Sequence, residues 1–257
     1  MADGLAFRCN ICGARNTSRL GELAREHQDC GCGSTVRSRA VIGLLAKELF
    51  GSTLCIEDFP PSPGLRGIGL SDWPGFADRL AAQLDYTNTF FHQPPRLDIT
   101  DVPQALAASA DFMISSDVFE HVVPPVAAAF EGARRLLKPG GLLVLTVPFR
   151  ALGEHTIEHF PDLHDWSLGQ DDAGVWRLEN RRRNGSREVF TDLQFHGGPG
   201  TTLEMRVFTR ESLLRELVRA GFRDVRVADE PMPEIGVVWP VFPDYRAGKS
   251  LPVVARA

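Results

Sequence analysis

The chain has 257 residues, of which 43% are hydrophobic, enough to bury one core of good size with room for a small appendage. The net charge of −5 argues against a nucleic-acid partner held through its phosphates. No apolar run approaches the roughly 20 residues of a membrane-spanning helix. The N-terminus also lacks the basic and then apolar pattern of a signal peptide, so we expect a cytoplasmic protein with no membrane partner.

Four of the five cysteines form two close pairs near the N-terminus, Cys-x2-Cys and Cys-x-Cys, with seventeen residues between them. In a reducing compartment, thiolates in this arrangement are typical ligands of a tetrahedral structural Zn²⁺. The spacing predicts a zinc knuckle over residues 1–35. The alternatives are unrelated reduced cysteines, or His27 in place of one thiolate. The expected ligands are Cys9, Cys12, Cys30 and Cys32.

The segment after the second cysteine pair begins with two basic residues, Arg37 and Arg39, which we expect on the surface rather than facing a ligand. Apolar positions recur at helical spacing from Val36 to Phe50, and Gly51 is suited to end a helix there. Residues 54–56 are a short apolar run that we expect to form the first strand of a sheet.

Two further strands are expected at residues 66–70 and 86–92. Asp72 lies just past the first of these, where a carboxylate can accept hydrogen bonds from both hydroxyl groups of a ribose. The alternative for Asp72 is an N-cap of the helix expected over residues 77–84.

The most informative stretch of the chain runs from residue 111 to residue 149. Residues 112–116 form an apolar run that ends in small polar residues, as a buried parallel strand does at a ligand-binding edge. Residues 126–137 are apolar at helical spacing, and the sequence KPGG at 138–141 ends that helix. Residues 142–147 are a second apolar run. This pattern predicts a βαβ crossover, and such sheets bind ligands at the carboxyl ends of their strands.

The sequences SSDVFEHV and LKPGGLLVLTVPF resemble the fourth and fifth strands of class I S-adenosylmethionine (SAM)-dependent methyltransferases. This resemblance implies an α/β, Rossmann-like sheet with helices on both faces, SAM as the cofactor and methyl transfer as the activity. The segments GLSDW, YTNTFFH and LDITD are similar to those of a bacterial subgroup whose first turn is poor in glycine.

The resemblance also implies roles for residues near the first two strands. Members of the family follow the first strand with an acidic residue and a glycine-rich turn, so Glu57 and Asp58 are candidates for contact with the methionine end of the cofactor. Three prolines follow them where the family has glycines, which departs from its pattern. The family's acidic residue at the ribose corresponds to Asp72.

Further along the chain, the same resemblance implies that Asp98 binds the adenine amino group and that Ile99 lies against the adenine ring. It places Ser115 and Ser116 beside the sulfonium and the amino acid of the cofactor.

Residues 150–208 exceed a minimal methyltransferase sheet, and we expect a β-hairpin insertion after the fifth strand that covers the cleft and selects the substrate. Asn184-Gly185 between two β-rich runs is a strong hairpin signal. The insertion is rich in histidines, and His159 and His196 are candidates for a general base. His121 is a third candidate, with a plain polar residue at a strand end as the alternative.

The segment HTIEH at 155–159 also matches the His-x-x-Glu-His pattern of inverted zinc peptidases, which needs both histidines on one helix. Gly153 and Pro161 flank it too closely for such a helix, so we disfavour this alternative. Thr209 is expected to cap the last helix.

We therefore expect residues 36–257 to form a methyltransferase that acts on a small-molecule or saccharide acceptor, at a hydroxyl group. Two alternatives stay open. One is a methyltransferase-like protein that has lost catalysis and serves as a scaffold, which the proline-rich first turn favours. The other is a nucleic-acid-binding module led by the zinc knuckle, which the acidic balance disfavours.

Overall fold

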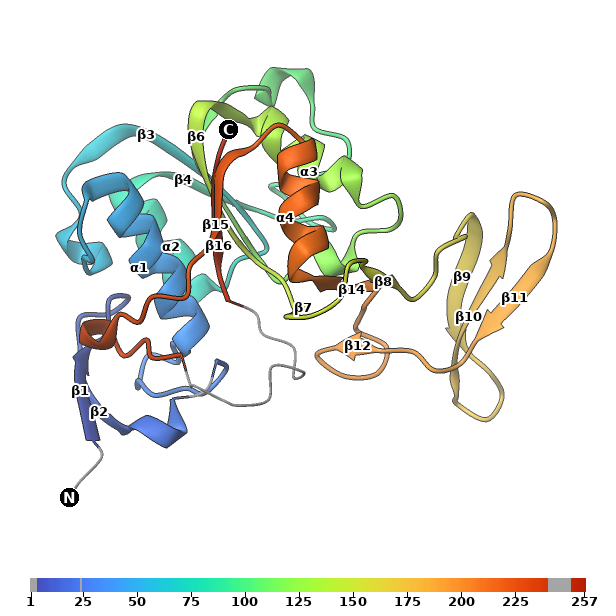
Figure 1. Ribbon diagram of the computed structural model, residues 1–257, viewed down its shortest axis with the longest axis horizontal. Coiled ribbons are helices and arrows are strands. Elements are labelled where there is room, and N and C mark those ends of the chain that lie inside the picture. Colours follow the sequence, from blue (N-terminus) through green and yellow to red (C-terminus); the bar gives the residue numbers. More distant parts are fainter. Residues whose placement is uncertain (1–3, 24, 240–250) are drawn as a thin grey trace.

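A computed structural model describes residues 4–23, 25–239 and 251–257. At its centre is a six-stranded sheet in the order β15-β16-β6-β5-β3-β4 (Figure 1). Strands β3 to β6 run parallel, and β16 runs antiparallel to both of its neighbours. The strands of this sheet are β3 (Ser62–Leu70), β4 (Leu84–Thr89), β5 (Ala110–Ser116), β6 (Leu137–Thr146), β15 (Arg223–Val227) and β16 (Val253–Arg256).

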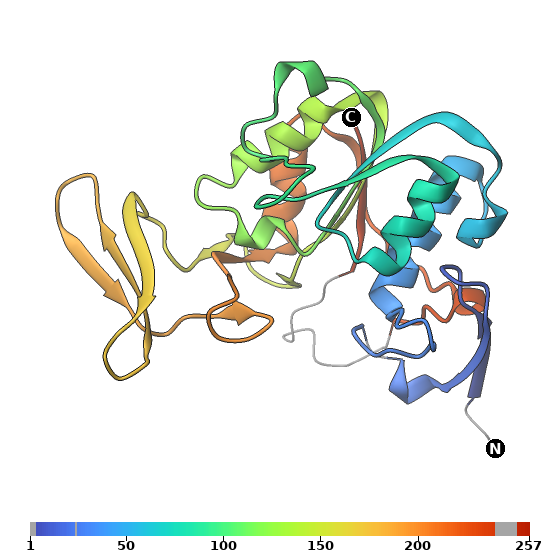
Figure 2. The ribbon, with the colours of Figure 1, turned by 180° about the vertical axis from the view of Figure 1, so that it is seen from behind.

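Helices cover both faces of the sheet (Figures 1 and 2). Helices α1 and α2 share one buried apolar cluster with the sheet, and α3 and α4 share another. Neighbouring strand residues alternate between the two clusters, as Phe112 and Met113 of β5 do. The α/β architecture is therefore confirmed. The helices are α1 (Val36–Phe50), α2 (Pro74–Gln83), α3 (Ala127–Leu136), α4 (Arg210–Arg219) and the short 3₁₀ helices η1 (Leu20–Glu22), η2 (Ile56–Asp58), η3 (Gln104–Leu106), η4 (Phe119–His121) and η5 (Pro233–Ile235).

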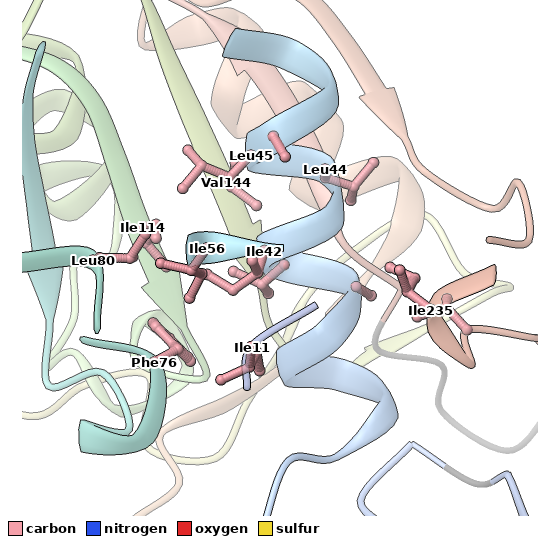
Figure 3. Packing of buried hydrophobic residues seen from close by; sticks show 14 of the residues in the cluster. Ile11, Ile42, Leu44, Leu45, Ile56, Phe76, Leu80, Ile114, Val144 and Ile235 are labelled. Carbon is pink, nitrogen blue, oxygen red and sulfur yellow. The ribbon is translucent and has the colours of Figure 1, made fainter. Parts of the chain in front are cut away.

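The first of these clusters places α1 directly against the middle of the sheet. Figure 3 shows Leu45 of α1 beside Val144 of β6 and Ile42 beside Ile56, in the cluster that also contains Ile114 of β5. Because α1 is held in this way, its N-terminal turn lies at a defined position near the sheet edge. Among the described residues, none of the helices has the length and apolar character required to cross a membrane.

Local chemistry sets the ends of the helices. The Thr35 side chain accepts a hydrogen bond from the Ser38 backbone N–H, and the Ser38 hydroxyl accepts one from the Thr35 backbone N–H. Gly51 ends α1 with a φ of 81°, a conformation that glycine adopts without strain. Thr209 caps α4 through the same pair of bonds. The predicted helix over Val36–Phe50 and the predicted cap at Thr209 are confirmed.

The prediction of a first strand at residues 54–56 is wrong. Ile56 begins η2, and its backbone N–H donates a hydrogen bond to the carbonyl of Asn10 in the N-terminal segment. A short apolar run can be buried by packing against a helix, as Ile56 packs in the cluster of α1, or by joining a sheet. Its apolar character alone therefore does not identify a strand. The first strand of the sheet is β3, which pairs directly with β5. The turn after the first strand therefore starts at Ser71, and the proline-rich segment lies outside it.

The N-terminal segment forms an antiparallel hairpin of β1 (Gly4–Arg8) and β2 (Arg15–Arg19). Phe7 of this hairpin belongs to the same buried cluster as α1 and Ile235 of η5. The segment thus shares its core with the sheet domain. The boundary between residues 1–35 and 36–257 remains a prediction.

Arg39 is fully buried, and its predicted surface position is wrong. Its guanidinium donates hydrogen bonds to Asp29 Oδ2 at 2.9 Å and to the Gly236 carbonyl at 3.1 Å, and it lies over the Phe7 ring. A buried guanidinium needs such partners, and here they join α1 to the N-terminal and C-terminal segments.

Residues 150–208 form three small β units beside the main sheet. The β9-β10-β11 sheet stands away from the body of the molecule in both views, whereas β12 and β13 lie nearer to it (Figures 1 and 2). The hairpin predicted at Asn184-Gly185 is confirmed, because β10 pairs antiparallel with β11 across it. The strands are β7 (Phe149–Arg150), β8 (Ile157–Glu158), β9 (Asp165–Gln170), β10 (Trp176–Arg181), β11 (Arg187–Phe190), β12 (Phe195–His196), β13 (Thr202–Leu203) and β14 (Arg206–Thr209).

Candidate active site

A cavity of about 400 Å³ lies at the carboxyl ends of β3 and β5. Residues from three parts of the chain enclose it: the turns after these strands with the start of α2, the first turn of α1 with the loop before it, and β12 of the insertion. Ligands of doubly wound sheets bind at this edge, so the cavity is the candidate active site. Its lining residues are Glu26, Gln28, Gly33, Thr35, Arg37, Ser38, Ser71, Asp72, Trp73, Phe76, Ser116, Asp117 and His196.

Asp72 is a buried acidic group in the cavity wall. The Tyr86 hydroxyl donates a hydrogen bond to Asp72 Oδ2, and Asp72 Oδ1 has no hydrogen-bond partner in the described part of the chain. Burial raises the pKa of Asp72 to about 8, against the opposing effects of the Tyr86 hydrogen bond and the Arg37 charge. A Cβ at Gly69 would lie 2.3 Å from Asp72 Oδ2, so glycine in β3 is required for the carboxylate to fold back over the strand.

Arg37 reaches from α1 to the end of β5. Its guanidinium donates a hydrogen bond to Ser116 Oγ at 2.5 Å and lies 3.5 Å from Asp117 Oδ2. Asp117 also accepts hydrogen bonds from Arg25 at 2.6 and 2.8 Å. Burial alone would raise the pKa of Asp117, but the charges of Arg25 and Arg37 hold it below its usual value. Asp117 is therefore ionised, and it ties the N-terminal segment to the sheet edge.

Three acid–base side chains meet at the His196 side of the cavity. His121 Nε2 lies 3.7 Å from Glu120 Oε1, and His196 Nδ1 lies 3.9 Å from the same oxygen. Burial, together with the charge of Asp117, raises the pKa of Glu120 well above its usual value. Burial lowers the pKa of His121; a hydrogen bond to the Leu203 carbonyl opposes this and the neighbouring His196 adds to it. The His121 ring is therefore neutral at pH 7 and can accept a proton.

Comparison with known families identifies the fold around this cavity. A family model described as a methyltransferase domain matches residues 61–227, which is more than half of the chain. The chain belongs to this methyltransferase family. The resemblance to class I SAM-dependent methyltransferases, the Rossmann-like fold class and the assignment as an enzyme are confirmed. The scaffold alternative loses its support, because the proline-rich segment that favoured it is not the first turn.

Solved structures of methyltransferases are similar to this one at low sequence identity. The CurJ carbon methyltransferase is 16% identical with a TM-score of 0.49, over 87% of this chain and 55% of that chain. A SAM-dependent methyltransferase from Mesorhizobium loti is 16% identical with a TM-score of 0.44, over 88% of this chain and 100% of that chain. The 1,6-didemethyltoxoflavin-N1-methyltransferase of Burkholderia thailandensis is 13% identical with a TM-score of 0.43, over 84% and 76% of the two chains. A search of curated proteins found no match.

The methyltransferase cavity contains some of the residues predicted to bind the cofactor. Asp72 and Ser116 line it. Ser115 is fully buried one residue away, and its hydroxyl makes no hydrogen bond to a described residue. Glu57 and Asp58 are not part of the cavity wall. Both form ion pairs with Arg8 of β1, at 2.7 and 2.9 Å.

Asp98 and Ile99 also lie outside the cavity lining. Asp98 Oδ1 accepts hydrogen bonds from the backbone N–H and the hydroxyl of Thr100, at 2.9 and 2.7 Å, which forms a local turn. Ile99 is buried in the cluster of α3, and its carbonyl lies so close to Gly132 that a Cβ there would approach it to 1.7 Å. Both residues therefore lie in the segment between β4 and β5, outside the cavity wall.

The three histidines predicted as bases fall into two groups. His121 and His196 meet at Glu120, with 5.3 Å between the centres of their rings. His159 lies apart from them, and its Nε2 is 3.0 Å from Glu204 Oε1. Only His196 lines the cavity directly.

The peptidase-like segment at 155–159 contains no helix. Residues Ile157 and Glu158 form β8, and Glu158 pairs with the buried Arg206 at 2.8 Å. The two histidines therefore cannot share a helix face, which excludes the zinc-peptidase alternative.

Three residues of this site were missed or misplaced by sequence reasoning: Arg37, Asp117 and Glu120. Asp117 and Glu120 stand in the SSDVFEHV segment, in which only the serines and the histidine were predicted to act. A weak signal for both existed, because acidic residues directly after a buried strand lie at the ligand-binding edge. Arg37 carried no such signal. Its position at the cavity depends on how α1 lies against the sheet.

The four predicted zinc ligands lie together in the structure. Their sulfur atoms all lie within 4.8 Å of one another, with 3.9 Å between Cys9 and Cys32 and 3.5 Å between Cys12 and Cys30. Thiolates around a tetrahedral Zn²⁺ are about 3.8 Å apart, so this donor set fits zinc. Burial raises the pKa of Cys32, but hydrogen bonds with Ser34 outweigh it and bring the value to about 7. His27 pairs with Asp29 and is not part of the sulfur cluster.

Proposed function

We propose that the protein binds SAM in the cavity at the carboxyl ends of β3 and β5 and methylates a hydroxyl group of a small-molecule or saccharide acceptor. The observation that carries this proposal is Asp72 Oδ1, a buried oxygen in the cavity wall that has no hydrogen-bond partner among the residues described. A buried carboxylate oxygen of this kind is stabilised by a ligand that donates a hydrogen bond. The amino group and the hydroxyl groups of SAM are such donors.

The corrected strand order changes the contact that we propose for Asp72. Because β3 is the first strand of the sheet, Asp72 stands in the turn that, by resemblance, faces the methionine end of the cofactor rather than the ribose. Ser116 lies across the cavity, with Arg37 beside it as a cation for the cofactor carboxylate. Ser115, Asp98 and Ile99 remain proposals for the sulfonium and adenine sides, and Glu57 and Asp58 are the weakest candidates.

When bound, SAM supplies an electrophilic methyl group on a sulfonium. The chain must then align the acceptor oxygen with that methyl group, exclude water and receive the hydroxyl proton. His196 is the histidine of the cavity wall and His121 is its neutral neighbour, so these two are the proposed bases. His159 is a more distant candidate, since its ring already pairs with Glu204. The zinc knuckle is proposed to be structural, because four thiolates leave no open position on the metal.

Calorimetric titration with SAM and with its demethylated product tests the cofactor site. We expect micromolar binding by the wild-type protein and a loss of roughly tenfold or more in Asp72→Asn, which keeps the shape but removes the ability to become a carboxylate when the cofactor binds. Asp98→Ala is expected to weaken binding without unfolding the protein.

Asp101→Ala is the matched control, because Asp101 is an exposed aspartate of the same loop that does not line the cavity. No binding of either ligand by folded, zinc-loaded protein would contradict the proposal. If binding is retained, radiolabelled methyl transfer to a panel of sugars and small hydroxylated compounds identifies the acceptor, and transfer only to amines would contradict a hydroxyl acceptor.

A further inference from the structure

The carboxylate of Glu120 is buried without a partner. Its side chain is fully buried, and neither Oε1 nor Oε2 accepts a hydrogen bond from any group in the described ranges. Protonation alone would leave the hydroxyl of the acid equally unpartnered. Burial of a carboxyl group in either form is costly unless a donor or a cation compensates it.

His121 Nε2 lies 3.7 Å from Glu120 Oε1, and a hydrogen bond at the other ring nitrogen fixes which nitrogen of this imidazole carries the hydrogen. His121 Nδ1 lies 2.9 Å from the carbonyl oxygen of Leu203. A carbonyl can only accept, so Nδ1 carries the hydrogen, and Nε2 presents a lone pair on the side of Glu120. Metal-binding histidines are typically oriented by a hydrogen bond of this kind from the other ring nitrogen.

The third group comes from the insertion. His196 is in β12, and Leu203 is in β13, the strand that pairs with it. This small hairpin therefore supplies His196 and, through the Leu203 carbonyl, orients His121. One ligand atom from each of Glu120, His121 and His196 lies within 4.8 Å of the other two. Ligands of a tetrahedral zinc ion at about 2.0–2.1 Å are roughly 3.4 Å apart. The distances of 3.7 and 3.9 Å to Glu120 Oε1 are within a few tenths of an ångström of that value.

We propose that Glu120, His121 and His196 bind a divalent transition-metal ion through one carboxylate oxygen and two imidazole nitrogens. Two histidines and one carboxylate suit zinc, iron, cobalt or manganese, and three protein ligands leave at least one position open. His196 also lines the cavity, so an ion held by it would lie at the cavity wall. If the proposed function holds, an acceptor hydroxyl on this ion loses its proton to solvent water more readily and becomes a better nucleophile. The ion would then activate the acceptor in place of His121 and His196, because it occupies the nitrogens that would otherwise accept the proton.

Cobalt(II) is a suitable probe, because its visible absorption distinguishes nitrogen and oxygen ligands from thiolates. The full chain, with zinc retained in the knuckle and loosely held ions removed by a mild chelator, is titrated with Co²⁺. We expect one added Co²⁺ per chain without a thiolate charge-transfer band. Glu120→Gln and His196→Ala are each expected to weaken the binding of this added Co²⁺ roughly tenfold or more.

His159→Ala is the matched control, because His159 belongs to the same insertion and also faces a glutamate, Glu204, but lies outside the cluster. Its Co²⁺ affinity should equal that of the wild type. His196 is half-exposed, so His196→Ala is expected to fold even if the change at the buried Glu120 does not. Absence of added Co²⁺ in the wild type, unchanged affinity in His196→Ala, or a thiolate band on the added ion would overturn the metal site.

SAM binding, measured on the same samples, separates this inference from the proposed function. Protein that binds SAM but no added Co²⁺ keeps the function and loses the metal site. Protein that binds Co²⁺ at these ligands but no SAM keeps the metal site and loses the function.

Discussion

Asp72 illustrates how one side chain can be suited to a ligand and unsuited to the protein without it. Its carboxyl group is buried, hydrogen-bonded at one oxygen by Tyr86 and unpartnered at the other. The cost of burying its charge appears as a pKa of about 8. Ligand-binding groups often carry this kind of penalty, because the partner that removes it is the ligand.

This shift predicts a pH dependence of stability in the absence of cofactor. The pKa of Asp72 is about 8 in the native state against an ordinary value of 3.8. Between these values the native state holds a proton that the unfolded state has lost. The contribution of Asp72 to the unfolding free energy is therefore full at low pH and is lost as the pH rises to 8, by up to about 1.4 kcal/mol per pH unit. Urea unfolding from pH 5 to 8 should show a flatter profile in Asp72→Asn.

Asp78→Asn is the control for this experiment, because Asp78 is an exposed aspartate of α2. Its profile should follow the wild type. Equal slopes in the wild type and in Asp72→Asn would show that Asp72 is ionised in the native state.

Residue-level prediction from the sequence succeeded where the chemistry is local and failed where it depends on distant partners. The four cysteines were identified by spacing alone. The burial of Glu120 depends on the β12–β13 hairpin, about 75 residues further along the chain, and the position of Arg37 depends on the ends of β5. No local pattern around Glu120 or Arg37 encodes these contacts.

Helix α1 carries two ion pairs that we expect to contribute differently to the free energy of unfolding. Arg39 and Asp29 are both fully buried, whereas Lys47 and Glu230 form an exposed pair. Removing one partner of a buried pair leaves the other charge uncompensated in a poor solvent for ions. Water screens the exposed pair.

We therefore expect Arg39→Met to lower the free energy of unfolding by about 3–5 kcal/mol, since methionine keeps the apolar volume but removes the buried cation from Asp29 and leaves it with His27 as its partner. Lys47→Ala should change it much less. Chemical unfolding of both variants at neutral pH measures the difference. Similar losses of unfolding free energy in the two variants would contradict the larger contribution expected of the buried Arg39–Asp29 pair.

The elements themselves were largely predictable, with one instructive failure. Helix α1 and the cap of α4 follow from periodicity and from Gly51 and Thr209, which act within a few residues. The strand expected at residues 54–56 failed because burial was mistaken for membership of the sheet. That error made β3 the second strand of the sheet instead of the first, and the ribose contact expected for Asp72 depends on that number and stays a prediction.

For the whole molecule, the N-terminal segment is part of the core and of the cavity wall. Phe7 and Ile11 share the cluster of α1, and Glu26 and Gln28 line the cavity. The sulfur cluster joins the loops that carry these residues, and a zinc ion bound there would stabilise the segment.

Loss of one cysteine ligand should therefore reduce both zinc content and cofactor binding. Cys32→Ser is expected to contain one zinc fewer per chain than the wild type and to bind SAM more weakly. Cys55→Ser is the control, because Cys55 is a buried cysteine outside the sulfur cluster. Elemental analysis and calorimetry measure the two effects, and wild-type zinc content in Cys32→Ser would contradict the knuckle.

The position of β16 also bears on the order in which the protein can form during synthesis. Strand β16 (Val253–Arg256) lies between β6 and β15, although both of these are translated before it. Until residues 253–256 leave the ribosome, the two neighbouring strands have no partner between them and their unpaired edges face the cellular environment. A nascent chain stalled after β15 would thus be a candidate for chaperone capture, and the completed sheet would form only after translation had passed residue 256.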